Sequence, residues 1–183
     1  MFNYTGDNEK VKKAVVLAND YELLNHVYGE ILRAPQYDYS NAPNTYIAAK
    51  YFEFMRIVDI NIKIYYPRWK WSKAMGYFSP VDSRSVNING YMLNRMTLEQ
   101  LVSLFYHESA HSWDYTDTKY HVHHGDNSPD GKQNTMMYSI NRYVYEFFNY
   151  EYKPKTFVPW YKKLYNQVKR FIYAKLSNWF NYY

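Results

Sequence analysis

Apolar residues recur at helical spacing along the first part of the chain. They do so over residues 9–34, with a break at Asn19 and Asp20 that divides the pattern. After a connection rich in Pro and Asn, residues 45–57 carry apolar side chains along one side. We therefore expect helices in both segments.

The period then changes from helical to alternating. In VDINIKIYYP, the residues Ile60, Ile62 and Ile64 alternate with polar neighbours, which is typical of a strand with one buried face. The segments AMGYFSP (74–80) and SRSVNINGYML (83–93) predict two more strands. The middle of the chain is thus expected to form a sheet.

A helix with a strong start signal follows the third strand. Thr97 and Gln100 fit a capping box, in which each side chain accepts a hydrogen bond from the other residue's backbone. An apolar stripe continues from there to Ala110. Polar residues with Gly and Pro predict a loop over 116–134, and helical spacing returns over 135–150.

Composition narrows the class of protein. The chain has 183 residues, 47% of them apolar, which is enough for one domain with its own core. It has no cysteine, so any metal would need His, Asp, Glu or Tyr ligands. The N-terminus lacks the pattern of a secretory signal, and no segment approaches the roughly 20 apolar residues of a membrane span. We expect a soluble, cytoplasmic protein.

The segment HESAH lies in the second half of the capped helix. His107 and His111 are four residues apart, so their side chains share one helix face and can bind one zinc ion. Glu108 can reach a zinc-activated water without binding the metal. The alternative is a set of polar residues on a helix surface. Against it, five of the six histidines fall between residues 107 and 124.

With this motif, residues 50–150 resemble the zincin superfamily of zinc metallopeptidases. The resemblance implies an α+β, zincin-like fold in which a twisted mixed sheet packs on the HExxH helix. Zinc would lie in a cleft beneath an edge strand that pairs with the substrate peptide, and we expect that edge strand at residues 85–92. Zinc is the implied cofactor and Glu108 the implied general base. N-terminal and C-terminal helices complete the expected fold.

A catalytic zinc site has three protein ligands and keeps one position for water, so a third ligand is expected beyond the motif. The segment HHGDN resembles the His-Gly ligand segment of short metzincin-like proteins and favours His124, with His121 or His123 as near substitutes. Asp117 lies at the metzincin spacing but lacks the Gly that precedes it in that branch. Glu146, on the next helix, corresponds by this resemblance to the gluzincin ligand, but a solvated or tyrosine-bonded helix residue is the preferred interpretation.

The segment NTMMYSIN resembles the metzincin Met-turn. By that resemblance Met136 lies beneath the zinc and Tyr138 donates a hydrogen bond to the oxyanion. Ordinary core packing of both residues is the alternative. Carboxylates that would orient the histidine rings are expected from Asp114, Asp117 or Asp126.

The chain is expected to divide into a metallopeptidase domain, residues 1–153, and a basic amphipathic helix within residues 154–183. From Trp160 to Trp179 the apolar and basic residues separate onto two helical faces. This helix packs on its own domain, on a protein partner or on an anionic surface. Nucleic acid is disfavoured, because the net charge of +5 is mild and no nucleic-acid-binding module is recognisable.

Two functional hypotheses follow. The first is a zinc metalloendopeptidase that hydrolyses a protein or peptide substrate. The second is a non-catalytic structural or assembly protein, such as a phage virion component, that keeps a zincin scaffold. The small size and the composition of the chain fit a phage or mobile-element origin.

Overall fold

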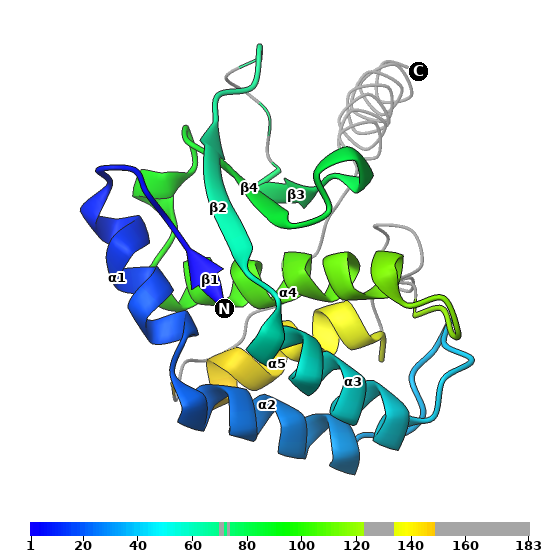
Figure 1. The fold of residues 1–183 in the computed structure, drawn as a ribbon. Coiled ribbons are helices and arrows are strands. Elements are labelled where there is room, and N and C mark those ends of the chain that lie inside the picture. Colours follow the sequence, from blue (N-terminus) through cyan, green and yellow to red (C-terminus); the bar gives the residue numbers. More distant parts are fainter. Residues whose placement is uncertain (70–71, 73, 123–133, 149–183) are drawn as a thin grey trace, which may run out of the picture. The chain divides into compact units, whose positions relative to one another are not determined.

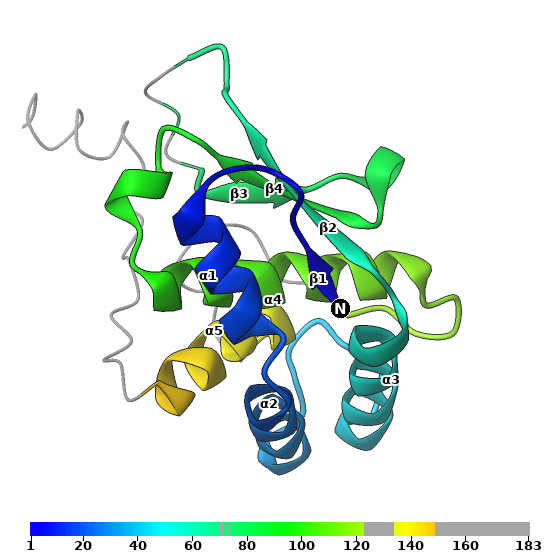
Figure 2. The same cartoon turned by 60° about the vertical axis from the view of Figure 1, so that its left-hand side comes forward.

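A small mixed sheet lies against one side of the helix that carries the HESAH segment, and further helices pack against its other sides (Figures 1 and 2). This computed structural model describes residues 1–69, 72, 74–122 and 134–148. The predicted helix within 154–183 lies outside the described residues. The elements are β1 (Phe2–Asn3), α1 (Glu9–Ala18), α2 (Tyr21–Arg33), α3 (Asn44–Ile57), β2 (Ile60–Tyr65), β3 (Gly76–Phe78), η1 (Pro80–Asp82), β4 (Ser85–Asn89), η2 (Leu93–Arg95), α4 (Leu98–Thr116) and α5 (Met136–Phe147).

The helix boundaries follow local signals. Asn19 ends α1, and the Asp20 side chain accepts a hydrogen bond from the Glu22 backbone N–H at 2.8 Å to begin α2, so the predicted break between two helices is confirmed. At the start of α4, the Thr97 hydroxyl accepts from the Gln100 N–H at 3.2 Å. The Gln100 side chain accepts from the Thr97 N–H at 3.0 Å, which confirms the capping box.

The sheet has the strand order β1-β2-β4-β3. β1, β2 and β4 run parallel, and β3 pairs antiparallel with β4. The fold is therefore α+β with a mixed sheet, as predicted. The expected edge strand at residues 85–92 is wrong, because its residues 85–89 form β4, which has a partner on each side and is buried along its whole length. The edge beside α4 is the short strand β3.

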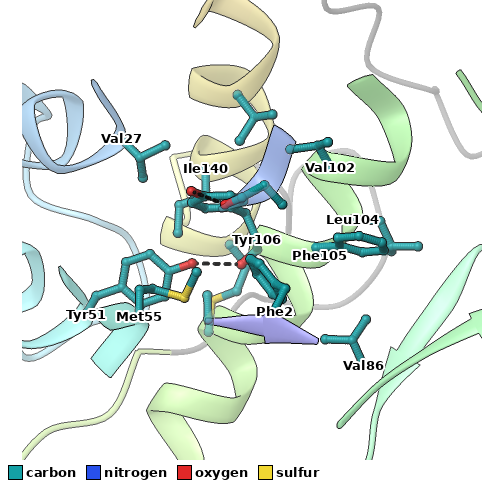
Figure 3. Packing of buried hydrophobic residues seen from close by; sticks show 14 of the residues in the cluster. Phe2, Val27, Tyr51, Met55, Val86, Val102, Leu104, Phe105, Tyr106 and Ile140 are labelled. Atoms are coloured by element: carbon teal, nitrogen blue, oxygen red, sulfur yellow. Dashed lines mark hydrogen bonds between the residues drawn. The ribbon is translucent and has the colours of Figure 1, made fainter. Parts of the chain in front are cut away.

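The first strand was missed by the sequence patterns. β1 has two residues, too few for a periodic signal. Its Phe2 is held by Asn19, whose amide accepts from the Phe2 N–H and donates to the Phe2 carbonyl, both at 2.8 Å. The Phe2 ring is buried against Phe105 and Tyr106 of α4, with ring centres 5.5 and 5.7 Å apart (Figure 3).

Helix α4 is the centre of the core. Every residue from 101 to 110 is buried, because the sheet covers one side of the helix while α1 and α5 cover others. Buried tyrosines place their hydroxyls on backbone acceptors. The Tyr51 hydroxyl donates to the Tyr106 carbonyl at 3.0 Å (Figure 3), and the Tyr106 hydroxyl donates to the Ala18 carbonyl at 3.1 Å. Among the described residues, no helix is long and apolar enough to cross a membrane.

Candidate metal centre

His107 and His111 lie side by side on α4, with His107 beside α5 and His111 beside β3. Their ring centres are 5.1 Å apart, and the ring planes meet at 72°. His107 is 8% exposed, whereas His111 is only partly buried. Because the two residues are one helical turn apart within a helix fixed on several sides, their backbone positions are set by the fold. The spacing suits two imidazole ligands of one zinc ion.

The ring of His107 is oriented by α5. Its Nδ1 atom lies 3.0 Å from the carbonyl oxygen of Met137. A carbonyl oxygen can only accept, so Nδ1 carries the proton in this contact and Nε2 carries the lone pair. That is the tautomer in which a histidine binds a metal through Nε2.

Asn141 and Ser103 extend this contact. The Asn141 amide nitrogen lies 3.2 Å from His107 Nδ1, and its Oδ1 accepts from the buried Ser103 hydroxyl at 2.8 Å. Turning the amide over would instead place its oxygen against the Nδ1 proton, with its nitrogen donating to Ser103. Only the turned amide is compatible with a proton on Nδ1, because an amide nitrogen and a protonated Nδ1 are both donors. In that orientation, α4 and α5 hold the His107 ring through polar contacts. These partners were not foreseen, because no sequence motif links residue 141 to residue 107.

Glu108 is buried beside the histidine pair. Only 7% of the residue is exposed, and the burial raises the pKa of its carboxyl group to about 7. The backbone N–H of Phe78, on β3, donates to the carboxylate and opposes part of that rise. A carboxyl group with a pKa near neutrality can take up and release a proton at physiological pH.

The edge strand β3 reaches the same place. The Phe78 ring stacks on His111 with centres 6.3 Å apart and touches Tyr115 at 5.8 Å. Gly76 allows the strand to lie this close to α4. A Cβ atom at Gly76 would lie 2.6 Å from the Asn87 carbonyl oxygen and 3.0 Å from a Leu104 methyl carbon. The histidines, Glu108 and the sheet edge therefore lie together.

Tyr138, the predicted oxyanion donor, lies beside His107. Its half-buried ring lies 4.9 Å from the His107 ring, centre to centre. Met136 and Met137 are fully buried at the first turn of α5. The residue that contacts His107 through its backbone is Met137, one position after the methionine that the Met-turn resemblance singled out.

Asp117 has a structural role at the end of α4. Its carboxylate accepts from the backbone N–H groups of Lys119 and Tyr120 at 2.8 and 3.3 Å, and from the Tyr46 hydroxyl at 3.4 Å. These bonds turn the chain out of the helix. Asp114 likewise accepts from the Val122 N–H at 2.6 Å. Both carboxylates thus shape the segment that follows α4.

The other candidate third ligands are either distant or outside the described residues. Glu146 is exposed and pairs with Arg142 at 3.5 Å, and His121 is exposed beyond α4. Within residues 1–122 and 134–148, as far as they are described, no three His, Asp or Glu side chains lie close enough to hold one ion. His123, His124 and Asp126 fall outside the described residues.

The protein was compared with protein-family models, with curated proteins and with solved structures, and none of them matches.

Proposed function

We propose that the protein is a zinc metallopeptidase with a zincin-like fold. The observation that carries the proposal is the group of His107, His111 and Glu108 on one buried helix. The fold presents His107 with its Nδ1 proton on a carbonyl and Glu108 with a pKa near 7. A helix surface with incidental polar residues would have neither property.

The donor set fits zinc. Two neutral imidazoles form part of a catalytic zinc site, and the absence of cysteine leaves nitrogen and oxygen ligands. We assign the third position to His124, with His123 as the substitute, because the described His121 does not form a three-ligand group with His107 and His111. The structural bonds of Asp117 argue against its use as a ligand. A zinc ion held there supplies an electrophile for the scissile carbonyl and lowers the pKa of water to near 7.

The protein side chains would then perform the proton transfers and the positioning. Glu108 accepts a proton from the attacking water and delivers it to the leaving amine. Tyr138 donates a hydrogen bond to the developing oxyanion. The substrate peptide lies extended along β3, whose outer side has no strand partner among the described residues, and pairs with its backbone groups.

The arrangement of the sheet supports the zincin-like assignment. An antiparallel edge strand lies over the HExxH helix, and its Phe78 touches both Glu108 and His111. The strand before the helix, β4, is interior and parallel to β2. The outer edge of β3, which has no strand partner among the described residues, thus lies beside Glu108 and His111, and this supports peptide binding there.

The decisive experiment combines metal analysis with one substitution. Purified protein should contain stoichiometric zinc, His111→Ala should lose it, and wild-type protein should cleave an unstructured protein such as casein. Glu108→Gln should keep the zinc and lose cleavage. Absence of zinc from the wild-type protein after dialysis against zinc would refute the proposal. Bound zinc without any Glu108-dependent cleavage would instead favour the non-catalytic structural protein.

A further inference from the structure

The connection between β2 and β3 presents aromatic and basic side chains to solvent. Tyr66 is 66% exposed and Trp69 is 55% exposed, and Arg68 between them is exposed as well. We call these three residues the tip. Residues 66–69 leave the C-terminal end of β2 and extend away from α2, α3 and α5 in both views (Figures 1 and 2).

The tip residues contact one another and neighbouring residues. The Arg68 guanidinium lies 5.6 Å over the Trp69 ring, and the Tyr66 ring meets the Tyr91 ring edge-on at 5.2 Å. The Ser72 backbone N–H donates to the Trp69 carbonyl at 3.1 Å. The exposed rings are thus held in place by neighbours and not by burial in the core.

The charge of this region has one sign. Between Ile60 and Ser79 the sequence has four basic residues and no acidic one. Lys63 forms an ion pair with Asp82 at 2.5 Å, so its charge is neutralised locally. The other three basic residues lie in the connection between β2 and β3. These are Arg68, Lys70 and Lys73, and they are interleaved with Trp69 and Trp71.

We infer that the tip docks the protein on an anionic lipid surface. Tryptophan and tyrosine partition to the headgroup region of a bilayer, where the ring is shielded and its polar end stays hydrated. Each nearby Lys or Arg adds attraction to anionic lipids. A projecting segment can enter the headgroup region directly, so this kind of binding does not require a groove in the protein. Single-stranded nucleic acid, by contrast, is bound by grooves that follow its backbone. The inference is independent of the proposed zinc chemistry.

The absence of cysteine allows a local test on the full chain. Ser72→Cys, labelled with an environment-sensitive fluorophore, places the probe next to the tip, because Ser72 is hydrogen-bonded to Trp69. Val81→Cys, at a side chain that is 98% exposed in η1, is the matched control. Both proteins are titrated with vesicles of phosphatidylcholine, with and without phosphatidylglycerol, at low and high salt. Ala74→Cys, also at an exposed position, repeats the readout at a second position.

The tip probe should shift to shorter wavelength and brighten with anionic vesicles, and should respond weakly to neutral vesicles or at high salt. The control probe should not change. Arg68→Gln in the Ser72→Cys background should weaken partitioning about fivefold, the effect of one cation near the surface. The inference is overturned if both tip probes stay in water while the protein sediments with anionic vesicles. It is also overturned if they respond to single-stranded oligonucleotides and not to vesicles, or if nothing binds.

Discussion

His107 Nδ1 lies 3.0 Å from the carbonyl oxygen of Met137, and this contact joins α4 to the first turn of α5. The orientation of a proposed zinc ligand therefore depends on a helix that begins after the loop predicted to supply the third ligand. Zinc affinity and the packing of α5 on α4 should be coupled.

Asn141→Ala should lower zinc affinity by about 10- to 100-fold while the protein stays folded. The reason is that the His107 ring loses one of the groups that fix its orientation. A competitive titration with a chromophoric chelator measures the effect. Ser139→Ala, at a buried polar residue on the same helix, is the control and should bind zinc like the wild-type protein. Equal affinities of the two variants would contradict a role for Asn141 in the metal site.

His124→Ala and Asp117→Ala should affect different properties, the first zinc binding and the second stability. The first should lose zinc without a large change in the stability of the metal-free protein. The second should keep zinc but lower the free energy of unfolding by about 1 kcal/mol, because two backbone N–H groups lose their acceptor. Elemental analysis and urea denaturation of each variant measure both quantities. Zinc loss in Asp117→Ala alone would transfer the third ligand to that residue.

The stability of the metal-free protein should fall as pH rises from about 4.5 to above 7. The folded state holds the Glu108 pKa at about 7, above its ordinary value of 4.5. Over this range the folded protein binds more protons than the unfolded chain, so raising the pH favours unfolding. The full effect is on the order of 3 kcal/mol.

The control for this pH dependence is Glu108→Gln, which cannot ionise. Urea denaturation at pH 5 and pH 8 should show a smaller decrease in stability for the variant than for the wild-type protein. The same decrease in both proteins would show that Glu108 does not cause it.

Gly76→Ala should destabilise the protein by about 1–3 kcal/mol, because the new methyl group meets the Asn87 carbonyl and Leu104. Peptidase activity should fall further than zinc content, since the edge strand moves and the histidines stay on α4. Gly29→Ala is the matched control. Its Cβ would have ordinary contacts with Arg33, and replacing a helical glycine should stabilise α2 by up to about 1 kcal/mol. Unchanged cleavage in Gly76→Ala would argue against peptide binding at β3.

Tyr138→Phe should reduce the rate of peptide hydrolysis by about 10²-fold while zinc content stays the same, because only the hydroxyl group is removed. Tyr115→Phe, at an exposed tyrosine whose ring lies near Phe78, should have little effect. Steady-state kinetics on a fluorogenic peptide distinguish the two variants. If both variants cleave at the wild-type rate, the oxyanion donor is another group.

Local signals in the sequence predicted much of this fold. The capping box at Thr97 and Gln100 depends on neighbouring residues alone, and the alternation of Ile60, Ile62 and Ile64 reports a buried strand face directly. The order of strands is not local. The alternating pattern predicts a strand at residues 85–89. It cannot show that this strand, β4, lies between β2 and β3 in the sheet, with β3 at the edge.

The candidate site shows the same division. The HESAH spacing determines which side chains share a face of α4, so His107, Glu108 and His111 could be named from sequence. The contacts of His107 with Met137 and Asn141 require knowledge of how α5 packs on α4. The role of Phe78 likewise depends on a backbone N–H group, which every residue except proline has and which no motif can distinguish.

The pairing of β1 with β2 bears on the order of events during synthesis. Asn19 follows Phe2 by 17 residues, whereas Ile60, the strand partner of Phe2, is synthesised much later. Asn19 is available early, and its amide bonds to both backbone groups of Phe2. β1 can thus be held by the end of its neighbouring helix α1 while the rest of the sheet is still being translated, which limits the time that an unpaired apolar strand is open to aggregation.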